Sequence, residues 1–180
     1  MAIQSFLKIQ ELDAARKARK ILDRLIEIHE KENENFIPDT LSFNTVMYIS
    51  GRIHGSNAEK AEALQLAQGT YQDLCEFEAN GGPDKYTYDA LLECAINLLP
   101  ERNVKQRNQL ISAIITKCCD AGFISTLAIA RLKTNAYNVY KNLILTALKN
   151  TKRGNRINLE DLPAAWSRRV NERKKYRRNQ

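Results

Sequence analysis

The chain has 180 residues, of which 43% are hydrophobic and 27% charged, and its formal net charge is +7 at pH 7. These proportions are ordinary for a globular protein with a substantial core. No run approaches the ~18 apolar residues of a membrane span, and polar side chains interrupt the apolar core that a signal peptide would need at the first residues. We therefore expect no membrane partner.

Glycine and proline are scarce, with 7 and 4 copies, so long helices with few interruptions are expected. Apolar residues recur at three- and four-residue spacing along most of the chain, which is typical of amphipathic helices. The pattern predicts helices at residues 3–12 (short or incomplete), 13–32, 39–53, 58–79, 84–98, 104–119, 123–132 and 134–149, and a last helix with Pro163 in its first turn.

Local signals in two of these helices predict the roles of individual residues. Asn57 follows a turn and is expected to cap the helix at 58–79. Trp166 and Val170 are the expected apolar anchors of the last helix. The inward face of the helix at 58–79 is expected to contain Ala58, Ala61, Leu64, Ala67, Tyr71 and Leu74.

The sequence contains none of the motifs that usually carry catalysis. Gly-x-Ser-x-Gly, a phosphate-binding Gly-rich loop and His-Glu-x-x-His are all absent. The four cysteines lack Cys-x-x-Cys spacing, and neither histidine lies at ligand spacing from a cysteine. We therefore expect reduced thiols, no metal, no cofactor and no enzymatic activity.

A ten-residue block occurs twice, at residues 38–47 and 83–92. A second match lies upstream of each block, between residues 15–21 and 58–64. Self-similarity of this kind predicts a repeat architecture. The aligned pairs of the block are Pro38 with Pro83, Asp39 with Asp84, Leu41 with Tyr86, Ser42 with Thr87, Phe43 with Tyr88, Asn44 with Asp89 and Val46 with Leu91.

Each copy of the block predicts the start of a helix. Proline disfavours helical conformation in the residue before it, so the preceding element should end there. Asp39 and Asp84 are then placed to accept hydrogen bonds from the first backbone N–H groups of the new helix. In the first copy, Phe43, Val46 and Met47 supply the apolar face of that helix.

The block has the pattern Pro-Asp-x-x-[Ser/Thr]-[Phe/Tyr]-[Asn/Asp]. An apolar helix follows the pattern, and then a second helix that begins with Ala-x-Lys-Ala. This order of features resembles the pentatricopeptide repeat family. It is similar in particular to a longer-repeat version found in algae, as is the Leu-Pro-x-x-Trp-Ser segment from Leu162. The resemblance implies an all-α fold, an α-solenoid of antiparallel helix pairs forming one domain. Its expected parts are a partial repeat (1–39), a repeat (40–84), a divergent repeat (85–122), a capping helix pair (123–150) and a basic loop with a C-terminal helix (151–180).

The resemblance also implies that the protein binds single-stranded RNA, one base per repeat. The implied base-contacting pair is Asn44 and Asp84, a combination that in the family resembles a preference for uracil. Leu41 and Tyr86 occupy the slot whose side chains sandwich neighbouring bases. Asp89 departs from the pattern, because a carboxylate stands where the family has Asn, Thr or Ser.

Most of the positive charge lies at the C-terminal end of the chain. Residues 167–180 hold seven basic side chains against Glu172 alone, a distribution that favours non-specific attraction to phosphates and is also typical of a frayed, solvated end. The basic residues are Arg168, Arg169, Arg173, Lys174, Lys175, Arg177 and Arg178.

Two further expectations rest on the resemblance alone. The chain begins inside a repeat, which suggests the C-terminal part of a longer protein or a truncated gene model, and the family implies a mitochondrial or plastid location. RNA and other RNA-processing proteins are the expected partners. The competing hypothesis is a protein-interaction scaffold of the tetratricopeptide type, although the Trp, Leu-Gly and Tyr pattern of that family is absent.

Overall fold

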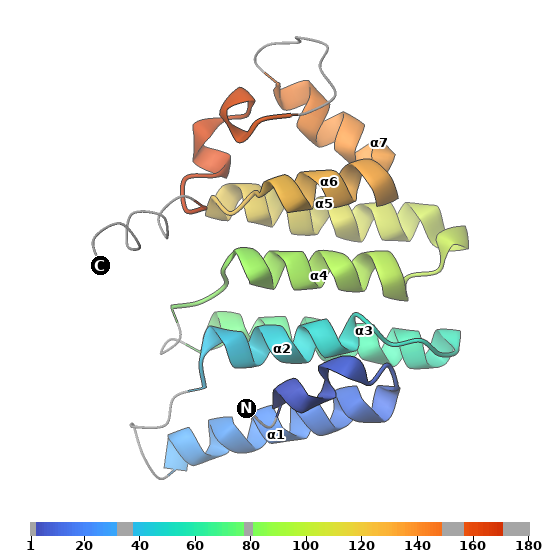
Figure 1. Ribbon diagram of the computed structural model, residues 1–180, viewed down its shortest axis with the longest axis vertical. Coiled ribbons are helices and arrows are strands. Elements are labelled where there is room, and N and C mark those ends of the chain that lie inside the picture. The colour runs from blue at the N-terminus through green and yellow to red at the C-terminus, as the bar shows by residue number, and fades with distance from the viewer. Residues whose placement is uncertain (1–2, 32–37, 78–80, 149–156, 171–180) are drawn as a thin grey trace. The chain divides into compact units, whose positions relative to one another are not determined.

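The computed structural model describes residues 3–31, 38–77, 81–148 and 157–170, and these residues are helical with connecting turns (Figure 1). The all-α class expected from the sequence is confirmed for this part of the chain. The chain folds as two compact units, residues 1–103 and 104–180. The boundary between them lies within the segment 85–122 that the sequence groups as one divergent repeat.

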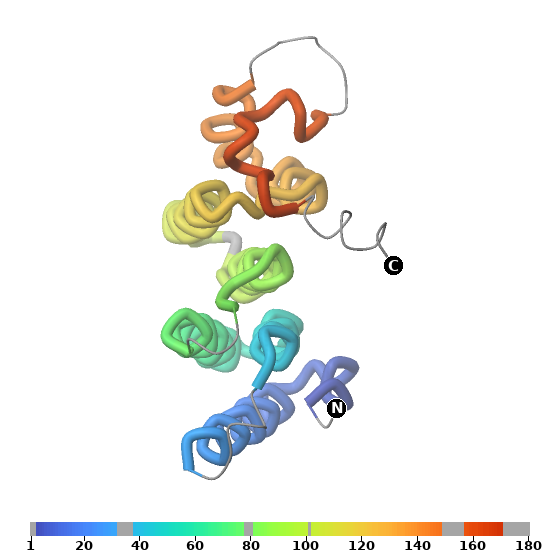
Figure 2. The backbone as a smooth tube through the Cα atoms, turned by 90° about the vertical axis from the view of Figure 1, so that its left-hand side faces the viewer, coloured from blue at the N-terminus to red at the C-terminus, as the bar shows by residue number. Residues whose placement is uncertain are grey.

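The first unit has two layers of helices. Figure 2 shows η1, α2 and α4 in one layer and α1 and α3 in the other, and α2 packs against each of the other four. A six-residue connection joins α2 to α3, so these two helices run antiparallel. The elements are the 3₁₀ helix η1 (Ile3–Lys8), α1 (Leu12–Lys31), α2 (Thr40–Ser50), α3 (Asn57–Glu76), α4 (Lys85–Leu98) and the short 3₁₀ turn η3 (Glu101–Asn103).

The core of the first unit lies between these layers. Phe43 and Met47 of α2 are fully buried, as the repeated block predicts, and Leu92 of α4 is buried with them. Small residues allow α1 to approach closely, since Ala15 and Ala18 have no exposed surface. The core therefore combines large side chains from the α2–α4 layer with alanines of α1.

Three helices of the first unit begin on a side-chain cap. Asp39 caps α2 and Asp84 caps α4, as predicted. The prediction that Asn57 caps α3 is wrong, because Ser56 holds that position and forms a capping box with Glu59. Asn57 is instead the first helical residue of α3. A serine followed three residues later by a glutamate is itself a known capping signal, so the correct cap could have been found in the sequence.

The buried face of α3 also differs from the prediction. Ala58 and Ala61 are exposed, whereas Ala67 and Leu74 are buried as expected. Ala63 and Thr70 complete the buried face, which therefore has four-, three- and four-residue spacing. The prediction followed the alanines of the second sequence match and so chose a face rotated from the real one.

The second unit is built on α5 (Val104–Ala121). α5 packs against α7, and α6 packs against α7 and the π-helical turn that follows it. The fully buried side chains of this unit include Ile111, Ile124, Leu132 and Ile144. The remaining elements are α6 (Thr126–Asn135), α7 (Tyr137–Val139), the π-helical turn η4 (Tyr140–Leu145) and the 3₁₀ turns η5 (Leu159–Asp161) and η6 (Ala164–Trp166).

The last helix predicted from Pro163 does not form over residues 163–170, where the described part of the chain ends. In this stretch the chain makes only the 3₁₀ turn η6, with Pro163 directly before it, and Trp166 is half-buried. Leu162 is the buried anchor of this segment. The backbone instead bonds to the end of α5, where Ile124 N–H donates to the Trp166 carbonyl at 2.8 Å and Arg169 N–H donates to the Gly122 carbonyl at 3.0 Å.

Gly122 makes this contact possible. Its φ is +81°, in the left-handed region that favours glycine at a helix C-terminus. A Cβ at this position would lie 2.6 Å from Cγ of Arg168 and 3.1 Å from the Ala165 carbonyl oxygen. The glycine therefore both ends α5 and leaves space for the C-terminal segment.

No helix among the described residues is long and apolar enough to cross a membrane.

Candidate nucleic-acid interface

The two copies of the repeated block meet at the start of α4. The carboxylate of Asp84 accepts hydrogen bonds at Oδ1 from the backbone N–H groups of Tyr86, at 2.9 Å, and Thr87, at 3.0 Å. The same oxygen accepts from Nδ2 of Asn44, on α2, at 3.0 Å. The structure thus brings together Asn44 and Asp84, the two residues of the predicted base-contacting pair.

Asn44 has a second partner that the sequence did not indicate. The hydroxyl of Thr87 donates to Oδ1 of Asn44 at 2.7 Å, and it accepts from the N–H of Asp84 at 3.0 Å. Thr87 has no exposed surface, and Asn44 is 2% exposed. The side chain of Asn44, one of the two residues implied to contact a base, is therefore enclosed between α2 and α4.

The two residues of the sandwich slot are exposed. Leu41 is 56% exposed and Tyr86 is 44% exposed, so both side chains are accessible from solvent. The ammonium group of Lys85 lies 4.7 Å from the centre of the Tyr86 ring, within the range of a cation–π interaction. Tyr86 and Asn44 both bond to Oδ1 of Asp84, so they lie at the same end of α4.

A series of polar contacts continues along the α2–α4 interface. The Tyr48 hydroxyl donates to Oδ2 of Asp89 at 3.1 Å, and Nε of Arg52 lies 3.2 Å from Oε1 of Glu93. Residues 44 and 48 on α2 and residue 52 in the turn after it follow four-residue spacing, as do residues 89 and 93 on α4. The sequence shows this spacing, but it does not show which residues of the two helices contact each other.

Asp89, the counterpart of Asn44 in the second block, is nine-tenths buried at this interface. Its bond to Tyr48 occupies the carboxylate within the first unit. Asp89, which departs from the pentatricopeptide pattern, therefore has a hydrogen-bond partner on the neighbouring helix α2.

The basic C-terminal cluster lies largely outside the described residues. Arg173, Lys174, Lys175, Arg177 and Arg178 fall there, and Arg168 and Arg169 are described. The Arg168 guanidinium donates from Nη2 to the Asp120 carbonyl at 3.1 Å, at the C-terminal end of α5 where a cation is favoured. The guanidinium of Arg169 lies 5.5 Å from the centre of the Phe123 ring. Both arginines therefore also help to hold the C-terminal segment in place.

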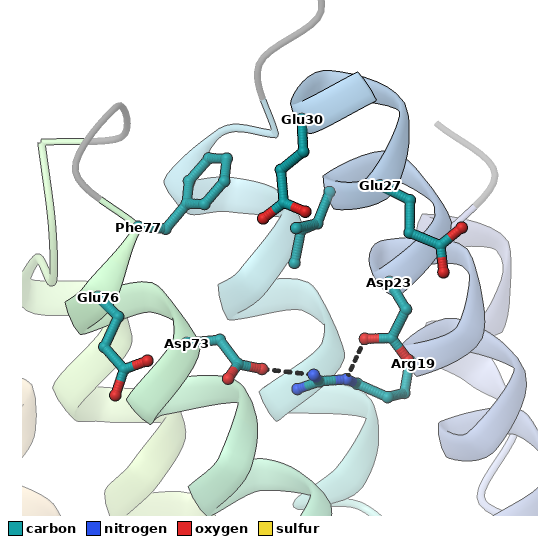
Figure 3. A pocket seen from close by; sticks show the side chains of 8 residues that line it. Arg19, Asp23, Glu27, Glu30, Asp73, Glu76 and Phe77 are labelled. Carbon is teal, nitrogen blue, oxygen red and sulfur yellow. Dashed lines mark hydrogen bonds and ion pairs between the residues drawn. The ribbon is translucent and has the colours of Figure 1, made fainter. Parts of the chain in front are cut away.

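An acidic cavity lies on the other layer of the first unit, between α1 and α3 (Figure 3). Its volume is about 390 Å³, and the lining combines five carboxylates with one guanidinium and two apolar side chains. Such a cavity repels phosphates and attracts cations. The lining residues are Arg19, Asp23, Ile26, Glu27, Glu30, Asp73, Glu76 and Phe77.

Arg19 connects the two walls of this cavity. Its guanidinium pairs with Asp73 of α3 and lies 2.7 Å from Oδ1 of Asp23 of α1 (Figure 3). It also donates from Nη1 to the Thr70 hydroxyl at 3.0 Å. Arg19 therefore compensates two of the carboxylates, while Glu27, Glu30 and Glu76 extend around the opening.

The described residues contain no group of three or more His, Cys, Asp or Glu side chains placed to hold a metal ion. Cys94, Cys118 and Cys119 are buried. Burial raises the pKa of the Cys119 thiol to about 12, and burial raises that of Cys94 further. The thiols of Cys94 and Cys119 therefore stay protonated at neutral pH and are poor nucleophiles and metal ligands.

Comparisons with known proteins found no matching family model, no matching curated protein and no matching solved structure.

Proposed function

We propose that this protein binds single-stranded RNA through helical repeats arranged as an α-solenoid of antiparallel helix pairs. It acts as a binding protein and not as an enzyme. The surface used is the one around the start of α4, where the two copies of the repeated block meet. We call this surface the α4-start surface and define it by Leu41, Asn44, Asp84, Lys85 and Tyr86.

The observation that carries the proposal is the equivalent exposure of Leu41 and Tyr86. These residues align in the repeated block, and both are large and apolar yet about half exposed. Bases are flat and apolar on their faces, so they stack on such side chains whatever their identity. Lys85 adds a positive charge beside Tyr86, which suits a phosphate next to a stacked base.

The Asn44–Asp84 pair supplies the polar part of the proposed contact. The two hydrogen bonds of Asn44 use one of its two amide N–H groups and one of its two carbonyl lone pairs. One donor and one acceptor site remain, which is the combination that matches the Watson–Crick edge of uracil. With Asn44 only 2% exposed, a base must approach closely along the edge between α2 and α4 to reach this amide.

The basic residues of the C-terminal end add affinity without sequence choice in this proposal. A mitochondrial or plastid location accompanies it, with a role in RNA processing, stability or translation alongside other RNA-processing proteins. The location is tested by imaging the tagged full-length protein, and a purely cytosolic signal argues against it.

The experiment for RNA binding is a titration of labelled single-stranded RNA at low salt, followed by fluorescence anisotropy. Replacing Tyr86 by alanine should weaken binding by about 5- to 150-fold, corresponding to the ~1–3 kcal/mol of one stacked base. Tyr137→Ala is the matched control, because Tyr137 is also a half-exposed tyrosine but lies in the second unit. Absence of binding by the wild type, or equal weakening by both variants, would refute the proposal.

The acidic cavity between α1 and α3 favours a second candidate function, a scaffold that binds a basic protein segment. Five carboxylates around two apolar side chains suit lysine or arginine next to an aliphatic residue. The test is a titration with a basic peptide, comparing the triple variant Glu27→Gln, Glu30→Gln, Glu76→Gln with the control Glu11→Gln, Asp120→Asn, Glu160→Gln. Both variants lose three exposed charges, and the cavity variant also loses the ion pair of Glu27 with Arg24 on α1, at 3.0 Å.

A further inference from the structure

We propose that Thr87 is a positioning residue for base selection, holding the amide of Asn44 in one orientation. The inference rests on the proposed RNA-binding function and adds a residue that touches no base itself. Its basis is the arrangement of hydrogen bonds around one buried hydroxyl at the α2–α4 interface.

The direction of these bonds follows from the donors and acceptors present. The N–H of Asp84 points at the Thr87 hydroxyl, at 3.0 Å, so the hydroxyl oxygen accepts there. Its single proton is then available for one acceptor. The nearer candidate is Oδ1 of Asn44, at 2.7 Å, and the alternative, Oδ1 of Asp84, is 3.2 Å away.

The two ends of the Asn44 amide are therefore fixed by different groups. An ionised Asp84 carboxylate only accepts, so it holds the NH₂ end, and the Thr87 hydroxyl holds the carbonyl end. Turning the amide over would place its oxygen against the carboxylate of Asp84. Thr87 and Asn44 are almost entirely buried, so these hydrogen bonds are shielded from solvent.

Replacing the Thr87 hydroxyl by a methyl group leaves the carbonyl end of the amide without its donor. Asn44 is then free to rotate about its side-chain bonds toward another donor, which changes the edge that it offers to a base. Base selection by this pair would thus depend on a residue in the second copy of the block, three positions after Asp84.

The first copy of the block provides a matched control. Ser42 aligns with Thr87, but its hydroxyl donates to Oδ1 of Asp39, the cap of its own helix, at 2.7 Å. Ser42→Ala therefore removes a hydroxyl at the equivalent position without touching Asn44. Thr87→Ser is the conservative variant, because it keeps the hydroxyl and loses only a methyl group.

The experiment selects RNAs bound by the whole chain from a randomised single-stranded pool and compares base frequencies at each position. Thr87→Val should reduce the preference at one position by about tenfold, the effect of one unsatisfied polar group. Thr87→Ser and Ser42→Ala should retain the wild-type preference. Binding of an unstructured homopolymer, which reports stacking and charge, should change by less than about twofold in Ser42→Ala.

The outcomes distinguish the two levels of the argument. If Asn44→Ala relaxes the preference and Thr87→Val leaves it intact, the RNA-binding function stands and the role of Thr87 is refuted. If the wild type binds RNA but selects no base at any position, the role of Thr87 is refuted and RNA binding stands; if it binds no RNA, both are refuted.

A second measurement reports the role of Thr87 without RNA. In nuclear magnetic resonance spectra, the two side-chain amide protons of Asn44 should shift and exchange faster with water in Thr87→Val, and keep their wild-type behaviour in Ser42→Ala. Unchanged Asn44 amide signals in Thr87→Val would overturn the inference even if base selection had changed.

Discussion

The two copies of the repeated block begin two helices with the same residue types but use their caps differently. In the first copy, Oδ1 of Asp39 accepts from the N–H of Ser42 at 2.8 Å and from its hydroxyl at 2.7 Å. In the second copy, Oδ1 of Asp84 accepts from two backbone N–H groups and also from Asn44 on the neighbouring helix. The first cap is local, whereas the second joins α2 to α4.

The same sequence pattern can therefore cap the start of a helix and also connect the two copies of the block. The change needed is small, because it lies in where one hydroxyl proton points. Ser42 directs its hydroxyl at its own cap, and Thr87 directs it mainly at Asn44. The polar contact between the two copies is therefore built from the same parts that cap each helix.

The largest expected effect comes from the aromatic residues of the two copies. Phe43 has no exposed surface, so Phe43→Ala should lower the free energy of unfolding of the first unit by about 3–5 kcal/mol. Tyr86→Ala, which removes an exposed aromatic ring, should cost less than about 1 kcal/mol. Hydrogen exchange of amides in α2 and α4 measures both, since the two units need not unfold together. Equal losses would mean that Phe43 does not anchor the core.

The next largest effect separates the two caps. Asp84→Ala removes a cap and leaves the buried amide of Asn44 without an acceptor, so it should cost about 2–4 kcal/mol. Asp39→Ala removes only a local cap and should cost about 1 kcal/mol. Hydrogen exchange at the first turns of α4 and α2 provides the measurement.

A double-mutant cycle sharpens the same comparison. Asn44→Ala and Asp84→Ala should couple by about 0.5–3 kcal/mol, because their side chains share a hydrogen bond. Asn44→Ala and Asp39→Ala should be additive, since no hydrogen bond joins that pair. Additivity in both cycles would show that the second cap is as local as the first.

Much of the helical layout could be predicted from the sequence. Helix periodicity and the two Pro-Asp signals located α1, α2 and α4 to within a few residues, and the caps Asp39 and Asp84 were predicted correctly. These features depend on neighbours in the chain, which the sequence shows directly. The resemblance implied that Asn44 and Asp84 act as a pair, and the structure joins the two side chains by a hydrogen bond.

The errors arose where the outcome depends on packing between distant segments. Asn44 lies between Phe43 and Thr45 on α2, and nothing in its own helix shows that Thr87 and Asp84 enclose it. Ala58 and Ala61 suit a buried face equally well, and only the approach of neighbouring helices selects Ala63 and Thr70 instead. The bond of Arg168 to the end of α5 also joins segments that are distant in the sequence, so it could not be foreseen.

A smaller effect compares the two hydroxyls on stability. Thr87→Val leaves Oδ1 of Asn44 and the N–H of Asp84 without a partner, so it should cost about 1–2 kcal/mol. Ser42→Ala should cost about 0.5 kcal/mol, because Asp39 still accepts from the Ser42 N–H at 2.8 Å. The readout is again hydrogen exchange in α2 and α4, and a larger loss for Ser42→Ala would reverse the comparison.

The smallest effect concerns acid. The start of α3 resembles that of α4 in having a capping box, but its third residue is Glu59, whereas α4 has the uncharged Thr87. The backbone N–H of Ser56 and then its hydroxyl, each 2.8 Å from Oε2, hold the pKa of Glu59 below its ordinary value of 4.5. A lowered carboxyl pKa stabilises the folded state above the ordinary value, and this contribution is lost as pH falls through the folded pKa.

Acidification from about pH 6 to about pH 3 should therefore loosen the first turn of α3 in the wild type. Glu59→Gln keeps a capping side chain that does not titrate, so its first turn should show no loss of this origin. The measurement is the exchange protection of the α3 first-turn amides in the two proteins across this range, with each rate corrected for intrinsic exchange. The difference in exchange protection between the wild type and Glu59→Gln would stay constant with pH only if the Glu59 carboxylate does not stabilise the start of α3. In that case, the capping boxes of α3 and α4 respond to acid in the same way at their third residue.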